Sequence, residues 1–254
     1  MDRLVFFGRV LPEFINFSLP VSPPIRLQNP NSGLDVTCRV LTKNSAVQID
    51  CESHGVYDFA DIHCRVYDAA KIPIDLECFA LGVSLDLIID RYIDRDSREY
   101  RLISRIDDLG ALCTAFDSFA SGSFDSFAEM YHLVATDLDL YMALNDLIAA
   151  IRVPRHAVLG CARAIESLRN IVKEPDMEVP AAWEKLRSVL NIHRSYLELI
   201  ISNSVAWRHG DRVHISRETC HEIFVRSWII MNRFLEYRKR GDTSLPVNDF
   251  PALV

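Results

Sequence analysis

The stretch HAVLGCARAIESLRNIV, residues 156–172, decides the fold class of the carboxy-terminal half of this chain. Its apolar side chains recur at the three- and four-residue spacing of one helix face, as Val158, Ala162, Ile165, Leu168 and Val172. An amphipathic helix must bury its apolar stripe against other elements. The pattern therefore predicts a helix that packs inside a bundle.

Similar helical patterns lie on both sides of this stretch. DLDLYMALNDLIAAI at 137–151 precedes it, and the Val153-Pro154 step that follows disfavours further helix. After it, we expect one long helix from Pro180 to about Trp207, then a last helix between the N-cap Ser216 and Gly241. Short connections between such helices favour an antiparallel bundle. Its expected core comprises Leu144, Ile165, Leu186, Leu190, Ile200, Phe224, Trp228 and Met231.

The amino-terminal part of the chain has a different pattern. Short runs rich in Val, Ile and Phe, separated by turn residues, predict antiparallel strands at LVFF, FINFSL, VTCRVL, AVQIDC and IHCRVY between Leu4 and Tyr67. The longer apolar stretch at 74–92 predicts a helix, and 99–106 a last strand. The sequence thus predicts an α+β protein, with an antiparallel β-rich domain containing one helix at 1–108 and a helical bundle at 109–254.

The composition is that of a globular protein, since 49% of the 254 residues are hydrophobic and 25% are charged. The first residues, MDRLVFFGRVLPEF, lack the unbroken apolar run of a signal peptide, and no apolar run reaches the roughly 20 residues that cross a bilayer. The seven cysteines are scattered, which is typical of reduced thiols. We therefore expect a soluble cytoplasmic protein without a membrane partner.

Charge is distributed unevenly along the chain. Residues 74–150 contain 5 Lys/Arg and 15 Asp/Glu, whereas residues 151–240 contain 16 Lys/Arg and 10 Asp/Glu. The plain interpretation of this pattern is that the charges are spread over solvated helix faces, and two further arrangements are open. Either the two segments dock on each other, or the basic end offers a face to an anionic partner.

The strongest functional signal lies between the last two expected helices, in NSVAWRHGDRVHIS at 203–216. A histidine can move a proton near neutral pH, and a guanidinium can hold a phosphate by two contacts. Together these groups can bind or cleave a phosphodiester without a metal. The structural alternative is that cations simply favour a helix C-terminus, with Gly210 as the residue that ends the helix. The residues concerned are Arg208, His209, Asp211, Arg212 and His214.

The phrases AIESLR, NSVAWRHGD and RFLEYRKR, on successive expected helices, resemble the HEPN superfamily over roughly residues 130–240. The resemblance implies a metal-independent ribonuclease in which an arginine precedes a histidine and two protomers share one site. His209 corresponds to the histidine, Asn203 to the polar residue that often neighbours the arginine, and Glu166 could face the His209 pocket. The positions expected for the arginine hold Ser202, Asn203 and Ser204.

This departure from the family pattern leaves two interpretations open: Arg208 substitutes from a neighbouring position, or the chain is an inactive binding or scaffolding member. The start, FFGRVLPE, is similar to bacterial proteins that pair a β-rich domain with a HEPN-like one. By analogy, the resemblance implies a sensing or docking domain joined to an effector.

Other groups of reactive residues give weaker signals. Cys51, His54, His63 and Cys64 resemble a zinc set, but His63 and Cys64 are neighbours in an expected strand and would point to opposite faces. We therefore expect no metal and no cofactor. His193, on the apolar stripe of the long helix, is interpreted as a hydrogen-bonded core histidine.

The leading hypothesis is a HEPN-like effector or accessory protein that binds RNA or another phosphate-bearing ligand, acting as a homodimer. Its expected catalytic residues are His209, Arg208 and Asn203, and its ligand-binding residues are Arg212, His214, Asp211 and Glu166. The alternative is a non-enzymatic interaction protein whose β-rich domain binds a protein partner. The two hypotheses share one fold and differ in their chemistry.

Overall fold

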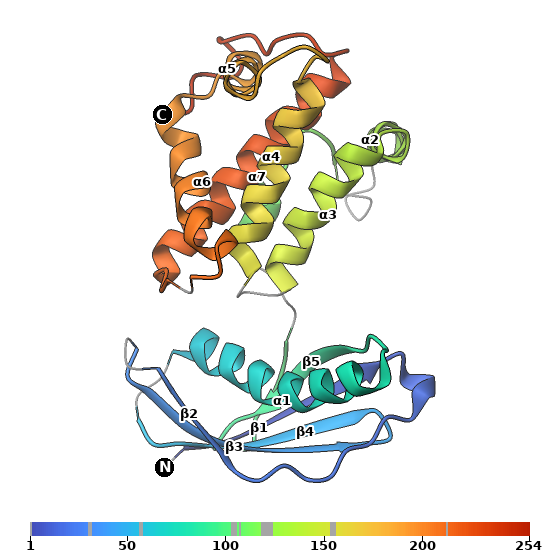
Figure 1. The fold of residues 1–254 in the computed structure, drawn as a ribbon, viewed down its shortest axis with the longest axis vertical. Coiled ribbons are helices and arrows are strands. Elements are labelled where there is room, and N and C mark those ends of the chain that lie inside the picture. Colours follow the sequence, from blue (N-terminus) through green and yellow to red (C-terminus); the bar gives the residue numbers. More distant parts are fainter. Residues whose placement is uncertain are drawn as a thin grey trace. The chain divides into compact units, whose positions relative to one another are not determined.

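The computed structural model describes residues 2–29, 32–55, 58–102, 106, 108–117, 124–152, 156–211 and 213–254. The chain forms two compact units, residues 1–103 and 104–254. The first contains an antiparallel sheet and the second contains helices, so the predicted α+β class is confirmed (Figure 1). The division falls five residues before the boundary expected at residue 108.

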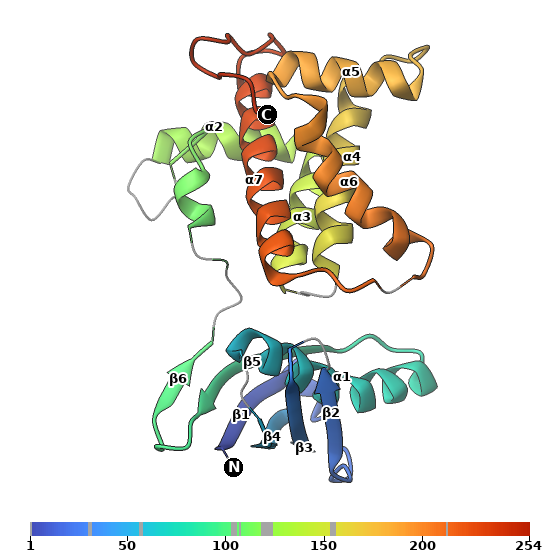
Figure 2. The same cartoon turned by 90° about the vertical axis from the view of Figure 1, so that its left-hand side faces the viewer.

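The first unit is built on one antiparallel sheet with the strand order β2-β3-β4-β1-β5-β6. Helix α1 (Phe59–Leu81) lies across one face of this sheet (Figures 1 and 2). A 3-10 turn, η1 (Glu13–Ile15), follows the first strand. The strands are β1 (Asp2–Leu11), β2 (Ile25–Asn29), β3 (Leu34–Lys43), β4 (Ala46–Ser53), β5 (Asp86–Ile93) and β6 (Glu99–Arg101).

The two faces of the sheet differ in chemistry because successive strand residues point to opposite sides. Phe6, Val36 and Ile49 are fully buried in the core cluster that α1 shares. Charged side chains occupy the opposite face and pair across strands, as Arg26 Nε does with Asp35 Oδ1 at 2.8 Å. The sheet therefore has one face in the core and one solvated face.

Strands β1 and β5 change register between Phe7 and Gly8. A Cβ added at Gly8 would lie 2.1 Å from the backbone oxygen of Ile88. This close approach of two backbones leaves no room for any side chain, and it requires glycine at the irregularity.

Three predictions for this unit were wrong. IHCRVY, expected as a strand, lies in α1, and part of the helix expected at 74–92 is β5. The reason is local, since the Asp58 side chain accepts a hydrogen bond from the Ala60 N–H and starts the helix, and the left-handed Gly82 ends it. FINFSL is not a strand either, because η1 occupies its beginning.

The second unit is a packed set of helices around α4, which contacts α3, α5, α6 and α7. A short 3-10 turn, η2 (Leu109–Leu112), precedes them. The helices are α2 (Phe124–Ala135), α3 (Leu138–Arg152), α4 (Ala157–Val172), α5 (Val179–Leu190), α6 (Arg194–Arg208) and α7 (Arg217–Lys239).

The core of the helical unit agrees with the predicted set of side chains. Leu144 and Trp228 are partly buried and pack against the core, and the other six are buried. Ser216 caps α7 as predicted, because its Oγ accepts a hydrogen bond from the Thr219 N–H. The six buried members are Ile165, Leu186, Leu190, Ile200, Phe224 and Met231.

The long helix expected from Pro180 to Trp207 is two helices, so that prediction was wrong. Asn191 breaks it with a left-handed backbone at φ 53°. Its amide Nδ2 donates to the carbonyl oxygens of Leu245 at 2.8 Å and Phe250 at 3.1 Å. The break therefore depends on residues that lie more than fifty positions later in the sequence.

His193 is an N-cap and not a core histidine. Its side chain accepts a hydrogen bond from the Ser195 N–H at the start of α6, and the residue is exposed. The interpretation of His193 as a core residue was therefore wrong, although its ring is hydrogen-bonded as expected.

Arg233 of α7 holds this junction and the last residues of the chain together. Its Nη1 donates to the carbonyl oxygens of Leu190 at 2.8 Å and Asn191 at 3.1 Å, and its Nη2 donates to that of Pro251 at 2.7 Å. Only 7% of Arg233 is exposed. Burial lowers the pKa of its guanidinium, while nearby Tyr196 opposes the shift.

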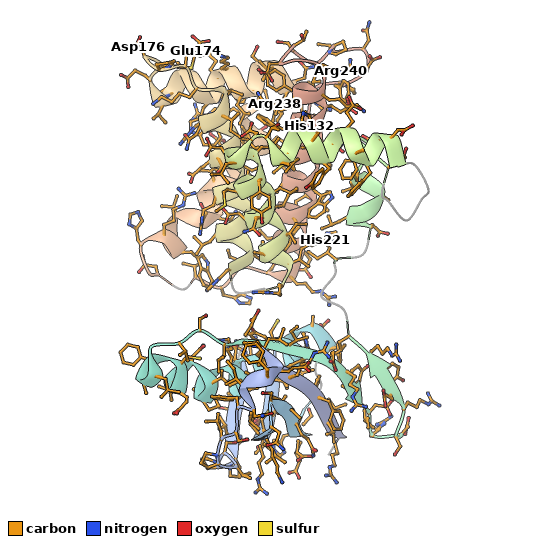
Figure 3. All side chains as sticks on the ribbon, turned by 90° about the vertical axis from the view of Figure 1, so that its right-hand side faces the viewer. His132, Glu174, Asp176, His221, Arg238 and Arg240 are labelled. Carbon is orange, nitrogen blue, oxygen red and sulfur yellow. The ribbon has the colours of Figure 1, made fainter. Side chains whose placement is uncertain are left out.

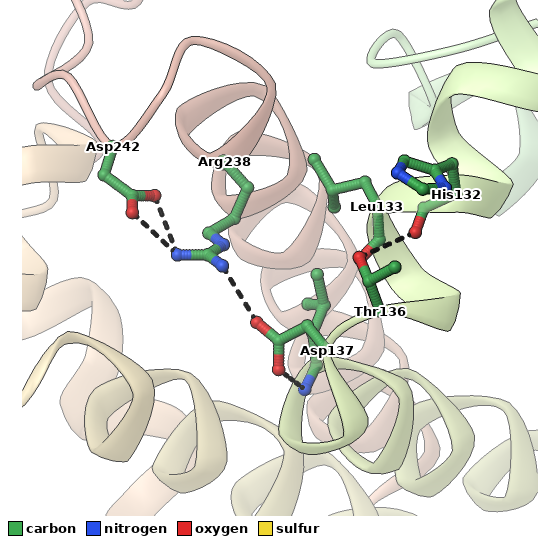
Figure 4. A network of polar contacts seen from close by, with 7 residues as sticks. His132, Leu133, Thr136, Asp137, Arg238 and Asp242 are labelled. Carbon is green, nitrogen blue, oxygen red and sulfur yellow. Dashed lines mark hydrogen bonds and ion pairs between the residues drawn. The ribbon is translucent and has the colours of Figure 1, made fainter.

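Within this unit, ion pairs join residues of the acidic middle to residues of the basic end. Asp137 accepts hydrogen bonds from the Leu140 N–H and from Arg238, which also binds Asp242 (Figure 4). Asp146 of α3 pairs with Arg163 of α4 at 3.2 Å. These pairs favour the docking interpretation of the charge pattern for part of the basic end.

No helix in the described parts of the chain combines the length and the apolar character that crossing a membrane requires.

Candidate functional site

The predicted site lies at the end of α6 and in the segment that leads to α7. Helices α6 and α7 are antiparallel, because Tyr196 at the start of α6 meets Arg226 and the segment before α6 meets Arg233 further along α7. The backbone N–H of His209 donates to the Val205 and Ala206 carbonyl oxygens and closes α6. The site therefore occupies one end of the helical unit.

Arg208 makes side-chain hydrogen bonds to two other helical residues of the second unit, Glu166 and Ser204. Its Nη1 donates to Glu166 Oε1 of α4 at 2.7 Å, and its Nη2 donates to Ser204 Oγ one turn earlier on α6, also at 2.7 Å. Its side chain is 33% exposed and that of Glu166 is 24% exposed. The guanidinium is thus held in one orientation while part of it still meets solvent.

Ser204 belongs to this site, and sequence reasoning missed it as a functional residue. The side chain is fully buried, and its hydroxyl donates to the Ile201 carbonyl oxygen at 2.7 Å while it accepts from Arg208. Residues four positions apart share a helix face, so the spacing of Ser204 and Arg208 was a usable signal. The serine fixes the side of α6 toward which the guanidinium turns.

Asn203 lies on a different side of α6. Its Nδ2 donates to the Leu199 carbonyl oxygen at 2.7 Å, within the same helix. At about 100° per residue, the five positions that separate Asn203 from Arg208 place the two side chains about 140° apart around the helix. Within one copy of the chain, the side chains of Asn203 and Arg208 therefore lie in different surroundings.

The remaining predicted residues lie beyond the end of α6. His209, Asp211 and His214 are exposed. Arg212 lies outside the described residues. The structure thus joins Arg208 with Glu166, and it leaves His209, the residue after Arg208, at the surface.

The surroundings of Glu166 on α4 are basic. Glu166 is the only acidic residue in α4, and Arg163 and Arg169 stand three positions before and after it. Side chains at that spacing are neighbours on a helix surface. Arg163 is 64% exposed beside Asp146, and Arg169 stacks over the Trp183 ring at 4.9 Å. Glu166 therefore lies among several guanidinium groups, of which Arg163 also pairs with Asp146.

The four residues considered for zinc have different surroundings. Cys51 lies beside Cys38 with 3.4 Å between their sulfur atoms, and His54 contacts Thr37. His63 stacks with Phe59 in α1, so the argument that placed it in a strand was wrong. In the described parts of the chain, no group of three or more His, Cys, Asp or Glu residues is placed to hold a metal ion.

Other titratable side chains of the helical unit are dispersed. His132 of α2 and His221 of α7 lie at different levels of the unit, and Glu174 and Asp176 lie near the end that carries α5 (Figure 3). These residues do not form a second cluster with the Arg208 site.

The fold and the site define a two-domain α+β protein with a partly exposed arginine at one end of its helical domain. Residues 4–102 match the family described as domain of unknown function DUF8168, N-terminal domain, and residues 127–239 match the DUF8168 C-terminal domain. The two matches together span most of the chain, which belongs to this family. No curated protein and no solved structure gave a match.

Proposed function

We propose that this protein is a HEPN-like accessory protein or effector that binds the phosphate backbone of RNA through Arg208. The observation that carries the proposal is the guanidinium held by Ser204 and Glu166 with a third of the side chain exposed. A guanidinium offers two parallel N–H donors to phosphate oxygens, and its fixed orientation reduces the entropy lost on binding.

Helix dipoles contribute little to anion binding at this site. The C-terminus of α6 carries partial negative charge, whereas the N-terminus of α7, at Ser216, carries partial positive charge. Both termini flank the same connecting segment, so their effects on a bound phosphate oppose each other. The attraction must come from the arginine side chains.

RNA cleavage is the further step that the HEPN resemblance suggests. It would require His209 near a ribose 2′-hydroxyl, and the resemblance implies that two protomers contribute to one site. The separate position of Asn203 and the serines at 202 and 204 support binding better than cleavage. We therefore propose RNA binding as the primary activity, with any cleavage dependent on His209.

Binding can be tested by titrating the pure protein with a single-stranded RNA at several salt concentrations. Arg208→Ala should weaken binding about tenfold, the effect of one lost hydrogen-bonded phosphate contact, and should reduce the salt slope by about one. Arg194→Ala is the matched control, because Arg194 pairs with Glu198 at 2.7 Å at the other end of α6. Equal losses in both variants would contradict a specific role for Arg208.

Cleavage can be tested by incubating the protein with total RNA in EDTA. Products that disappear in His209→Ala while RNA binding persists would support a metal-independent ribonuclease. Intact RNA alongside Arg208-dependent binding would support a binding function only.

A second candidate function is protein interaction through the first unit. Its supporting observation is an apolar stripe on α1 formed by Ile72, Leu76 and Phe79, the last of which is 90% exposed. Exposed apolar patches of this kind mark interaction sites. A protein that shows no salt-sensitive RNA binding in the titration above would favour this candidate.

A further inference from the structure

Glu166 occupies the position on Arg208 that a ligand phosphate would need. Its Oε1 accepts from Nη1 at 2.7 Å, while Ser204 accepts from Nη2 at the same distance. Ser204 is fully buried, so the serine contact faces the interior and the Glu166 contact lies on the partly exposed side. An incoming phosphate that takes the Nη1 hydrogen now bound by Glu166 must therefore replace the carboxylate.

We infer that Glu166 is an internal competitor that holds the anion site closed, so that RNA binding exchanges a carboxylate for a phosphate on Arg208. This inference rests on the proposed function. It changes the role expected for Glu166, from a ligand-binding residue to one that weakens binding.

Replacing Glu166 by a phosphate on Arg208 costs little free energy, because the Arg208–Glu166 ion pair is partly exposed. Ion pairs that meet solvent contribute about 0–1 kcal/mol, so a phosphate that restores both charge and hydrogen bonding can replace the carboxylate. The displaced Glu166 would remain close to Arg163 and Arg169 on α4, which stand one helical turn to either side. These arginines give the displaced carboxylate an alternative counter-charge.

Competition also makes the site selective. A weak anion gains nothing by replacing a carboxylate that is already in place, whereas a chain of phosphates gains from several contacts at once and from released counterions. The contact with Glu166 therefore favours a polyanion over a single small anion at Arg208.

Glu166→Gln tests the inference, because glutamine keeps an oxygen acceptor for Arg208 and removes the charge. We expect this variant to bind single-stranded RNA about three- to fivefold more tightly than the wild-type protein, the equivalent of removing a partly exposed ion pair. Glu198→Gln is the matched control, since Glu198 also accepts from an arginine at 2.7 Å and the substitution changes the net charge equally. The control should bind like the wild type.

The tighter RNA binding expected of Glu166→Gln must depend on Arg208. In the double variant Glu166→Gln/Arg208→Ala, the increase should vanish, which a double-mutant cycle measures directly. If Arg208→Ala weakens wild-type binding but Glu166→Gln and Glu198→Gln behave alike, the competition is refuted and the proposed function stands. If no variant binds RNA, the proposed function fails and the inference fails with it. If Glu166→Gln binds RNA and neither the wild-type protein nor the other variants do, the proposed function and the competition are both supported.

Discussion

An arginine lies at each end of helix α6, Arg233 of α7 beside its start and Arg208 in its own last turn, and the two arginines differ in their partners. At the start of α6, Arg233 is buried and donates to three backbone carbonyl oxygens. At the end, about 22 Å away for a helix of 15 residues, Arg208 is partly exposed and donates to a carboxylate and a hydroxyl.

This difference separates a structural arginine from an exchangeable one. Backbone carbonyl oxygens cannot leave Arg233 without unfolding the junction that they belong to. The Glu166 side chain can rotate away from Arg208 while both helices stay in place. Partner type and exposure together therefore indicate which arginine is available to a ligand.

The largest expected effect is at the buried arginine. Arg233→Met should lower the free energy of unfolding of the helical unit by at least about 3 kcal/mol, because it leaves buried carbonyl oxygens without donors. Urea unfolding followed by circular dichroism measures this loss. Arg194→Met, on an exposed side chain, should change the stability by no more than about 0.5 kcal/mol. A loss below about 1 kcal/mol in Arg233→Met would remove the contrast between the two ends.

A smaller effect is expected at Asn191, which Arg233 contacts through the backbone. Asn191→Ala should cost about 1–3 kcal/mol, because alanine tolerates the left-handed backbone poorly and cannot donate to Leu245 and Phe250. Asn191→Gly relieves only the backbone strain, so the difference between the two variants in the same unfolding assay isolates the strain. Equal stability of both variants would show that the lost amide contacts dominate.

At the exchangeable end, Arg208→Met should cost no more than about 1 kcal/mol of stability, since a partly exposed ion pair contributes little. The same variant should weaken RNA binding about tenfold, as Arg208→Ala does, so stability and binding should separate at this residue. Differential scanning calorimetry and the RNA titration, run on one preparation, check both. A melting transition as low as that of Arg233→Met would assign Arg208 a structural role.

The smallest effect concerns an exposed pair in the first unit, Arg26 with Asp35. The hydrogen bond from Arg26 lowers the pKa of Asp35 from 3.8 to about 2. A lowered pKa in the folded state adds stability above pH 4, and this contribution is lost as the pH falls from about 4 toward 2. Carboxyl chemical shifts in an NMR titration should report the low pKa, and Arg26→Gln should raise it. An unchanged Asp35 pKa in Arg26→Gln would contradict the pairing.

Sequence reasoning succeeded where structure follows from nearby residues. The stripe on 156–172 and the Ser216 cap each depend on contacts within a few positions, and both were predicted. The break at Asn191 depends on Leu245 and Phe250, so no local pattern could reveal it. Periodicity also failed at 74–92, because short apolar runs in a helix and in a buried strand look alike.

The candidate site shows the same division between local and distant information. Arg208 is visible in the sequence because it stands beside His209 and Gly210 at an expected helix end. The HEPN resemblance suggested Glu166 near the histidine, and its contact with Arg208 needed the packing of α4 against α6. The four-residue spacing of Ser204 and Arg208 could have revealed their contact. The HEPN pattern instead drew attention to the arginine that is missing from positions 202–204.

The register change at Gly8 gives a practical criterion for comparing chains of this family. Since any side chain there would collide with the Ile88 backbone, a related sequence can keep the pairing of β1 with β5 only if it keeps glycine at this position. A collection of diverged sequences should therefore vary freely at neighbouring exposed positions such as Arg9 while Gly8 stays fixed. A sequence with another residue at position 8 would mark a branch in which the sheet is paired differently.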